Sequence, residues 1–181
     1  MNDFLKILIV AVGLSMDAFS LAILYGTLNF SNKKILTLST FVGIFHFFMP
    51  LLGNVIGILI LKLLPIEPNV VVGIIFLIIS IEMVISTFKN EDVVDLKNIL
   101  SIILFAFTVS IDSFTVGIGL SAICNSNILA VSIFSIVSFL FTLMGLKIGG
   151  RLTQTFGTLA TMLGGIILFF VSIFYLFFYT G

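Results

Sequence analysis

Six long apolar runs divide this chain, and they restrict its fold more than any other feature. A helix of about 20 apolar residues crosses the hydrocarbon layer of a membrane, and it satisfies its backbone hydrogen bonds internally. The sequence therefore predicts an all-α membrane protein with six transmembrane helices. The runs cover roughly residues 4–27, 35–61, 69–88, 98–123, 128–149 and 157–179.

The composition points to the same class of protein. Of the 181 residues, 60% are hydrophobic and 9% are charged, whereas soluble domains carry about 25% charged residues. The formal net charge is zero, so we expect the lipid bilayer and not nucleic acid as the partner. Cys124 is the only cysteine, which excludes an intramolecular disulfide and a thiolate metal cluster within one chain.

Lysine and arginine are unevenly divided between the two ends of the predicted bundle. Short cytoplasmic loops carry an excess of these residues, so the richer face should be cytoplasmic and both termini should lie outside. The richer face holds Lys33, Lys34, Lys89, Lys97, Lys147 and Arg151, and the other holds Lys6 and Lys62.

The two halves of the chain repeat each other. Each half holds three spans, an odd number, so the halves must cross the membrane in opposite senses, as in many transporters. The sequence predicts two inverted-topology three-helix repeats, 1–90 and 98–181, joined by a cytoplasmic linker at 91–97. The matched segments are 15–19 with 110–114 at a shift of 95, and 53–57 with 145–149 and 73–80 with 165–172 at a shift of 92.

Two aspartates, Asp17 and Asp112, lie near the middle of matched spans. A carboxylate at that depth costs about 2.5–3.5 kcal/mol on insertion scales, so an acid inside a span is by default a functional residue. Stripes of small residues follow both aspartates, at 18, 22 and 26 and at 113, 117 and 121, and such stripes allow helices to pack closely. We therefore expect spans one and four to pack together and to bring both carboxylates onto one cation. The alternative is a pair of polar groups that only hold helices together.

Other polar residues inside the spans leave two interpretations open. His46 is either a metal ligand or proton-transfer group, or a histidine hydrogen-bonded across helices; Pro50 could loosen its helix. Glu82 could join the ion path, pair with Lys89 or reach the interface. Five neutral residues could supply oxygen atoms to the site or hydrogen-bond between helices: Ser15, Ser110, Asn54, Ser138 and Thr142. The acidic cluster of Glu91, Asp92 and Asp95 is typical of a solvated loop.

The chemistry of these groups favours a divalent cation. Carboxylates, hydroxyls and backbone carbonyls suit Mg²⁺, Ca²⁺ or Mn²⁺, and a histidine shifts the preference towards a transition metal. Protons could replace a departing ion on the carboxylates, so metal/proton antiport is a reasonable hypothesis. An enzyme is not expected, because the chain has no HExxH helix and no phosphate-cradling glycine loop.

Three motifs make the chain resemble a known family. They are Gly-Leu-Ser-Met-Asp-Ala-Phe at 13–19, Met-Pro-Leu-Leu-Gly at 49–53 and Ser-Ile-Asp-Ser-Phe-Thr-Val-Gly-Ile-Gly-Leu at 110–120. They resemble the MntP family of bacterial manganese efflux pumps, in the lysine-exporter-like superfamily, and the likeness covers the whole length. It implies a plasma-membrane secondary transporter that exports Mn²⁺, with Asp17 and Asp112 as ligands and no cofactor besides the transported ion.

The resemblance leaves the cargo and the metal preference open. Relatives have a carboxylate or amide in place of His46 and commonly a basic residue in place of Glu82, and either difference could retune the ion. One alternative is an exporter of another divalent cation or of a small solute such as an amino acid. Another is a non-transporting membrane protein of the sporulation type.

Overall fold

The computed structural model describes residues 3–63, 67–89, 96, 98–124, 126–151 and 154–178. Within these residues six helices are long and apolar enough to cross a membrane, with mean hydropathy between 2.0 and 2.4. This confirms the predicted all-helical membrane fold. The spans are Asp3–Gly26, Asn32–Leu63, Pro68–Ser86, Ile99–Ile118, Asn127–Arg151 and Thr155–Phe178.

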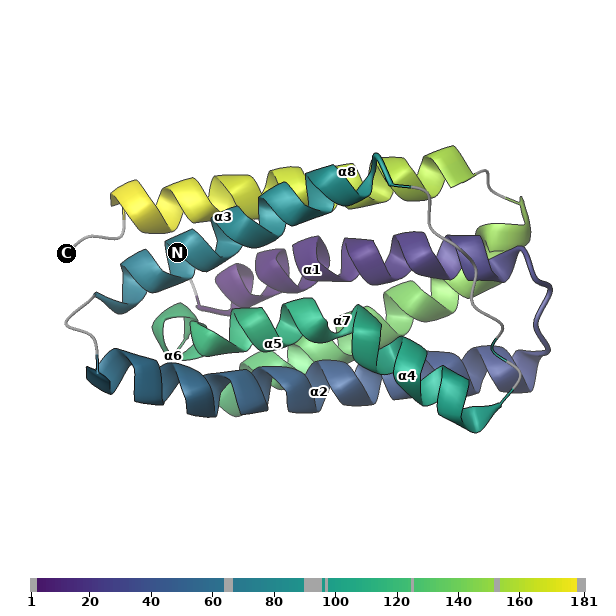
Figure 1. Cartoon of the computed structure of the whole chain (residues 1–181), viewed down its shortest axis with the longest axis horizontal. Helices are drawn as coiled ribbons and strands as arrows, with labels where there is room; N and C mark the ends of the chain where they lie inside the picture. The colour runs from purple at the N-terminus through teal and green to yellow at the C-terminus, as the bar shows by residue number, and fades with distance from the viewer. Residues whose placement is uncertain are drawn as a thin grey trace.

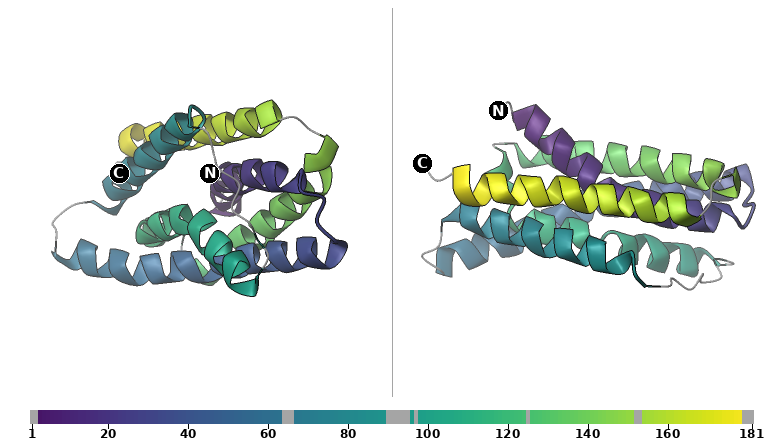
Figure 2. Two further views of the ribbon diagram at one scale, coloured as in Figure 1. Left: turned by 45° about the vertical axis from the view of Figure 1, so that its right-hand side comes forward. Right: turned by 90° about the horizontal axis from the view of Figure 1, so that it is seen from above.

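The helices run along the long axis of one bundle (Figure 1). The chain starts and finishes at the same end, which we call the terminal end (Figure 2). The opposite end, called the basic end, carries Lys33, Lys34, Lys147 and Arg151. The elements are α1 (Asp3–Gly26), α2 (Asn32–Leu63), α3 (Pro68–Ser86), α4 (Ile99–Val109), α5 (Ile111–Ile118), α6 (Leu120–Ile123), α7 (Asn127–Ile148), η1 (Gly149–Arg151), α8 (Gln154–Ile173) and η2 (Phe174–Phe178).

Local sequence signals explain where several helices begin. Pro68 occupies the first turn of α3, where its missing N–H costs nothing, and the preceding Glu67 is extended. At the start of α4 the Ser101 hydroxyl lies 3.2 Å from the backbone nitrogen of Asn98 and accepts its hydrogen bond. The turn after α1 contains Asn29 with φ of 51°, a conformation that asparagine tolerates better than most residues.

Two spans differ from the sequence predictions: the second is more regular than expected, and the fourth is less regular. α2 is unbroken through Pro50, so the loosening expected near His46 does not appear as a break in the helix. Span four, by contrast, is interrupted at Ser110 and Gly119, which separate α4, α5 and α6. Figure 1 shows α4 turning away from the line of α5. The Ser110 hydroxyl donates to the Ala106 carbonyl at 2.7 Å, the kind of side-chain bond that often bends a helix.

The small-residue stripe of α1 packs against α7. A Cβ added to Gly145 would lie 2.6 Å from the Ala22 side chain and 2.8 Å from the Phe19 carbonyl oxygen. A Cβ on Gly26 would lie 2.7 Å from the Leu146 carbonyl oxygen. These helices therefore touch backbone to backbone, as small-residue interfaces in membranes do.

The stripe of α5 packs in the same way, against α2. A Cβ on Gly117 would overlap Pro50, and Cβ atoms on Gly53 and Gly57 would overlap the carbonyl oxygens of Phe114 and Ile118. The Gly-xxx-Gly segments at 53–57 and 145–149 are thus the partners of the two stripes.

The expected packing of spans one and four is therefore wrong. In the described part of the chain, α1 packs mainly on α7 and α8, whereas α5 packs mainly on α2. The physical reason is that an Ala or Ser stripe still carries Cβ atoms. A glycine pair on the facing helix lets it approach more closely than a second such stripe would.

α3 and α8 form another close pair. The Ser172 hydroxyl donates to the Gly73 carbonyl at 2.8 Å. Seven residues earlier on α8, a Cβ on Gly165 would lie 3.2 Å from the Ser80 carbonyl oxygen. The segments 73–80 and 165–172, which match in sequence, therefore lie against each other.

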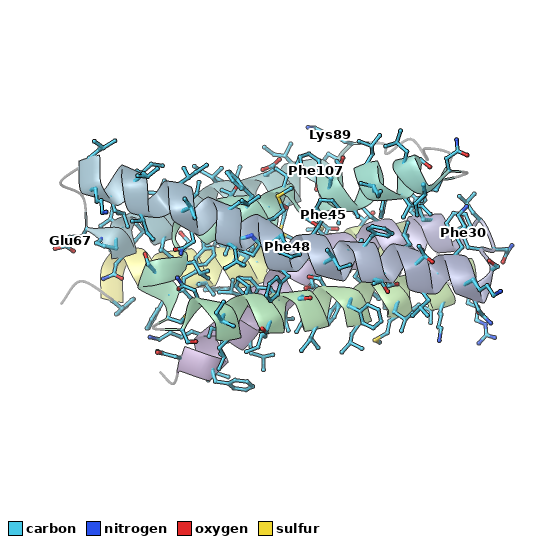
Figure 3. All side chains as sticks on the ribbon, turned by 90° about the horizontal axis from the view of Figure 1, so that it is seen from below. Phe30, Phe45, Phe48, Glu67, Lys89 and Phe107 are labelled. Carbon is cyan, nitrogen blue, oxygen red and sulfur yellow. The ribbon has the colours of Figure 1, made fainter. Side chains whose placement is uncertain are left out.

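The outer surface of the bundle is apolar. Phe48 of α2 is 56% exposed, and the rings of Phe45 and Phe107 meet edge to face with centroids 6.0 Å apart (Figure 3). Such a surface suits the hydrocarbon of a bilayer. The predicted repeat boundaries stay a prediction, and the linker at 91–97, its acidic cluster and Lys97 lie outside the described residues, apart from Leu96, which is buried.

Candidate functional site

Three acidic side chains from three separate helices line one cavity. Asp17 comes from α1, Glu82 from α3 and Asp112 from α5, and the cavity has a volume of about 260 Å³. The structure thus brings together the acids of both halves, although α1 and α5 are not the close pair that the sequence suggested. The remaining lining residues are Leu21, Met83, Ser86, Thr108, Val109 and Ile111.

Each acid reaches the cavity for a local reason. Asp112 lies in the first turn of α5, directly after the break at Ser110, where the helix dipole favours a negative charge. Asp17 lies within the continuous helix α1 and is half-buried, whereas Glu82 is exposed. Glu82 is close enough to Asp112 for their charges to repel each other. A cation between them would replace this repulsion by attraction.

The acids lie inside their membrane spans and not at the span ends. Asp17 lies nine residues before the end of α1, and Glu82 lies four residues before the end of α3. At 1.5 Å per residue these are distances of about 14 Å and about 6 Å from those helix ends. Asp112 is the second residue of α5, directly after Ser110. All three acids therefore lie within membrane-spanning segments.

The cavity is closed towards the terminal end. One helical turn below the acids lie Leu14, Ile79 and Val116, each no more than 2% exposed and all in one hydrophobic cluster. This cluster continues down α1, α3 and α6 to the terminal end. Apolar side chains therefore fill the half of the bundle between the acids and the terminal end.

The site lacks a complete protein coordination shell. Among the described residues, no three His, Cys, Asp or Glu side chains come close enough to bind one metal ion together. The cavity has room for several waters, and hard divalent cations commonly keep water as ligands. The arrangement therefore suits a partly hydrated cation that two or three carboxylates attract, and not a tightly caged structural metal.

His46 lies outside this cavity, in the interface between α2 and α5. Its Nδ1 is 2.9 Å from both the Val42 carbonyl and the Ser110 hydroxyl oxygen. Ser110 already gives its proton to Ala106, so Nδ1 must be the donor in this network. The structure thus gives His46 the bond across helices that the sequence left open. Its role as a metal ligand stays a prediction.

The neutral candidates also lie away from the acids. Ser15 forms a 2.8 Å hydrogen bond with Ser138 and so joins α1 to α7. Asn54 and Thr142 are buried in α2 and α7, and neither lines the acidic cavity. For these residues the supporting role stays a prediction, and the geometry favours bonds between helices for the two serines, Ser15 and Ser110.

Two hydroxyl residues that line the cavity, Ser86 and Thr108, were not among the predicted site residues, although Thr108 was considered as a hydrogen-bond partner of the aspartates. Both could have been found from helical spacing, because residues four apart share one face of a helix. Ser86 follows Glu82 by four positions, and Thr108 precedes Asp112 by four. The Thr108 hydroxyl donates to the Leu104 carbonyl at 2.9 Å, which leaves its oxygen as an acceptor.

Comparison with known proteins adds a family to this geometry. The family model described as "Putative manganese efflux pump" matches residues 29–176. A protein of that name from Bacillus pumilus is 32% identical over 168 residues, which is 92% of this chain and 91% of the relative. Relatives of the same name from Methanosphaera stadtmanae (34% identical, 91% and 93% covered) and Bacillus cereus (33%, 97% and 97%) are similarly close. No solved structure matches the chain.

Proposed function

The chain belongs to the manganese efflux pump family, a family of transporters and not of enzymes, and we propose that it exports Mn²⁺ from the cytoplasm across the plasma membrane. One observation carries this proposal. Asp17, Glu82 and Asp112 line a single cavity inside membrane-spanning helices. Acids at such depth are costly, and their common use is to bind an ion or proton in transit.

The ligand chemistry supports a hard divalent cation as the cargo. Carboxylates, hydroxyls and water suit Mg²⁺, Ca²⁺ and Mn²⁺, and Mn²⁺ is the ion in the names of the relatives. Asp17 and Asp112 are the principal ligands in this proposal, and Glu82 adds a third negative charge to the cavity. When the ion leaves, protons can neutralise the carboxylates, which would make proton antiport a source of energy.

Contacts between helices support two inverted repeats. In the repeat, Ala22 corresponds to Gly117 at the shift of 95, and Gly145 corresponds to Gly53 at the shift of 92. Ala22 contacts Gly145, and Gly117 likewise contacts Gly53. By the same shifts Ser15 corresponds to Ser110, and Ser138 corresponds to His46. Ser15 is hydrogen-bonded to Ser138, and Ser110 is hydrogen-bonded to His46. His46 is thus the counterpart of Ser138, a residue that joins two helices. A bundle with such matched contacts can alternate between two conformations in which the two repeats adopt each other's arrangement.

The pairing of α3 with α8 follows the same rule. A shift of 92 turns Gly73 into Gly165 and Ser80 into Ser172. The contact of Ser172 with Gly73 then becomes the contact of Ser80 with Gly165. This is the pattern that a two-fold axis between the halves would produce.

In this proposal the structure represents an inward-facing state. It assigns entry of the ion to the basic end, for which the excess of Lys and Arg predicts a cytoplasmic location. Export requires that the basic end close and that the apolar cluster around Leu14, Ile79 and Val116 separate, so that the same acids open to the outside. Both termini would then lie outside the cell.

Flux into proteoliposomes tests the proposal. Purified protein is reconstituted, and Mn²⁺ movement is followed for wild type, Asp17→Asn and Asp112→Asn. We expect each substitution to abolish flux, whereas Glu67→Gln, a change at the exposed start of α3, should leave it intact. Wild-type flux in either aspartate variant would remove that residue from the site.

Competing ions in the same assay identify the cargo. If Mg²⁺, Ca²⁺ or Zn²⁺ is carried in preference to Mn²⁺, the protein exports another divalent cation. If no divalent ion or amino acid crosses and both aspartate variants support a normal cell phenotype, the protein has a non-transporting role in the membrane.

A further inference from the structure

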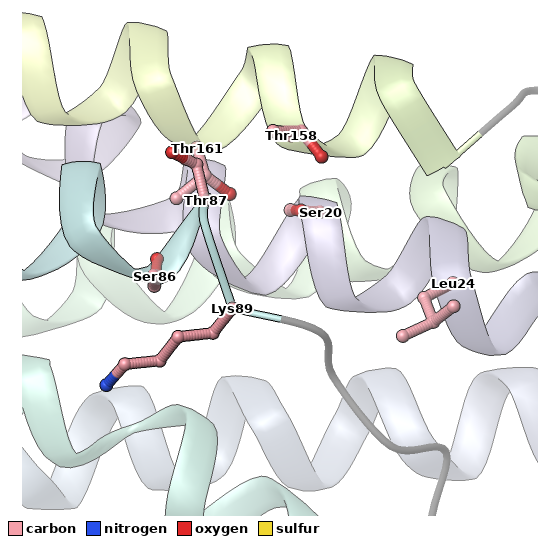
Figure 4. Close-up of a pocket in the computed structure, with 7 residues that line it drawn as sticks. All are labelled: Ser20, Leu24, Ser86, Thr87, Lys89, Thr158 and Thr161. Carbon is pink, nitrogen blue, oxygen red and sulfur yellow. The ribbon is translucent and has the colours of Figure 1, made fainter.

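A second, smaller cavity lies between α1, α3 and α8 near the basic end (Figure 4). Its volume is about 40 Å³, which is room for a few water molecules. Five hydroxyl groups and one ammonium group line it, with a single apolar side chain. The lining residues are Ser20, Leu24, Ser86, Thr87, Lys89, Thr158 and Thr161. We call the five hydroxyl residues of this set the hydroxyl ring.

The hydroxyl ring presents oxygen lone pairs. Ser86 donates its proton to the Met83 carbonyl at 2.8 Å, and Thr87 donates to the Val84 carbonyl at 2.6 Å. Thr161 points its hydroxyl towards the Gly157 carbonyl at 3.5 Å. Because these protons are directed at the residues' own helices, the oxygens are left as acceptors. Neutral oxygen acceptors are what a hard cation binds.

The backbone helps to form this ring. Gly157 of α8 has no side chain opposite Ser20, and an added Cβ would lie 3.0 Å from the Ser20 hydroxyl oxygen. α1 and α8 can therefore approach closely enough for hydroxyls from both helices to face one small space.

The ring lies next to the acidic cavity. Ser86 lines both spaces. Glu82 lies one helical turn deeper on α3, and Asp17 lies three residues deeper than Ser20 on α1. An ion that moves from the basic end along α1 and α3 therefore meets hydroxyls first and carboxylates second.

We propose that the hydroxyl ring is a transit site at which a divalent cation, partly stripped of water, is held before it reaches the carboxylates. This inference rests on the proposed transport function and assigns to it an access route and a place for dehydration. The small volume requires the ion to lose part of its hydration shell, and the hydroxyl oxygens replace the waters that it loses.

Lys89 keeps this site weak. Its side chain lines the cavity and extends away from Thr158 and Thr161 (Figure 4). A positive charge nearby lowers the affinity for a cation without covering the ring. Conduction requires this balance, because an ion must bind well enough to enter and weakly enough to move on.

At two positions of this route the second repeat has an apolar residue where the first has a polar one. A shift of 92 carries Glu82 and Ser86 onto Phe174 and Phe178 of η2. The hydroxyl and carboxyl groups of α3 are therefore not a by-product of the duplicated architecture. They mark the basic end as the side prepared for ion access.

A matched pair of variants tests the ring by transport. Thr161→Val removes one ring oxygen and keeps the shape of the side chain. Thr40→Val makes the same change at an exposed hydroxyl of α2 that also donates to its own helix, at 2.8 Å. We expect Thr161→Val to raise the half-saturating Mn²⁺ concentration about five- to tenfold, the loss of about one good polar contact, and Thr40→Val to have no effect.

The outcomes separate the two proposals. If Thr161→Val matches Thr40→Val while Asp17→Asn has lost flux, the ring is not on the path and the transport function stands. If Asp17→Asn transports like wild type, the proposed carboxylate site itself is wrong.

Thiol labelling tests the ring without relying on transport rates. Cys124, whose pKa is raised chiefly by burial, is first replaced in a Cys124→Ser background, and Ser86→Cys is added. We expect a membrane-impermeant thiol reagent to modify this variant from the basic end only, and Mn²⁺ to slow the reaction. Failure to react from that end, or an equal rate with and without Mn²⁺, would overturn the proposal.

Discussion

Gly149 and Gly150 are neighbours, yet one added methyl group should affect them very differently. A Cβ on Gly149 would overlap the Ile23 carbonyl oxygen and lie 2.9 Å from the Cα of Gly26. A Cβ on Gly150 would lie 3.5 Å from Asn29 Oδ1 and 3.6 Å from the Gly26 carbonyl oxygen, which is ordinary contact. Gly149→Ala is therefore the damaging change, and Gly150→Ala is its matched control.

The size of the effect follows from which atoms collide. The atoms opposite Gly149 belong to the backbone of α1 and cannot rotate away, so α1 and α7 must separate. A gap of about 0.5–1 Å forfeits about a quarter to a half of the dispersion energy of each atom pair across it. Overpacking typically costs about 1–3 kcal/mol, and we expect a loss of about 2 kcal/mol. Gly150→Ala should stay within about 0.5 kcal/mol of wild type.

Unfolding in mixed micelles of increasing dodecyl sulfate content measures this difference. The buried Cys124 thiol serves as the reporter, because it reacts with a fluorogenic reagent only when the bundle opens. Gly57→Ala should behave like Gly149→Ala, since its Cβ would overlap the Ile118 carbonyl oxygen. If Gly149→Ala and Gly150→Ala unfold at the same detergent fraction, the backbone contact between α1 and α7 does not exist.

Three further outcomes are expected. Ser172→Ala should lower the free energy of unfolding by about 0.5–1.5 kcal/mol in the same assay, because it removes the bond to Gly73; no change would contradict that bond. Glu82→Gln should weaken Mn²⁺ affinity in flux measurements about tenfold, because one charge facing the cavity is lost, and unchanged affinity would place Glu82 off the path. His46→Gln should keep flux within about twofold of wild type, because an amide can still donate to Ser110; a loss as complete as in Asp112→Asn would make His46 a ligand.

The spans were the most predictable part of the fold. Their existence depends on the length and hydropathy of each run, and both are properties of local sequence. The interruption at Ser110 was not predicted, because the run 98–123 contains no proline and its break depends on contacts with other helices. The bond between Ser110 and His46, 64 positions apart in the chain, is one such contact.

The partners of the small-residue stripes show a second limit. A stripe indicates that some helix approaches closely, but its residues do not say which one. The glycines at 53, 57, 145 and 149 were recognised as a repeat, yet their role as the facing surfaces depends on tertiary packing.

The candidate site was predictable to the extent that charge stands out in an apolar chain. Asp17, Glu82 and Asp112 were identified because ionisable groups are rare inside spans, and the structure places all three on one cavity. Ser86 and Thr108 were not predicted as lining residues, since serine and threonine are common in membrane helices and the sequence does not show which of them face the acids.

Binding of Mn²⁺ to the purified protein most directly tests whether Asp17 and Asp112 hold the same ion. The free ion is followed by its electron paramagnetic resonance signal in wild type, Asp17→Asn, Asp112→Asn and the double variant. We expect each single change to weaken binding at least about tenfold and the double change to add little, because groups that share one ligand are coupled. Wild-type affinity in either single variant, or losses that simply multiply in the double variant, would show that the two carboxylates do not act on one cation.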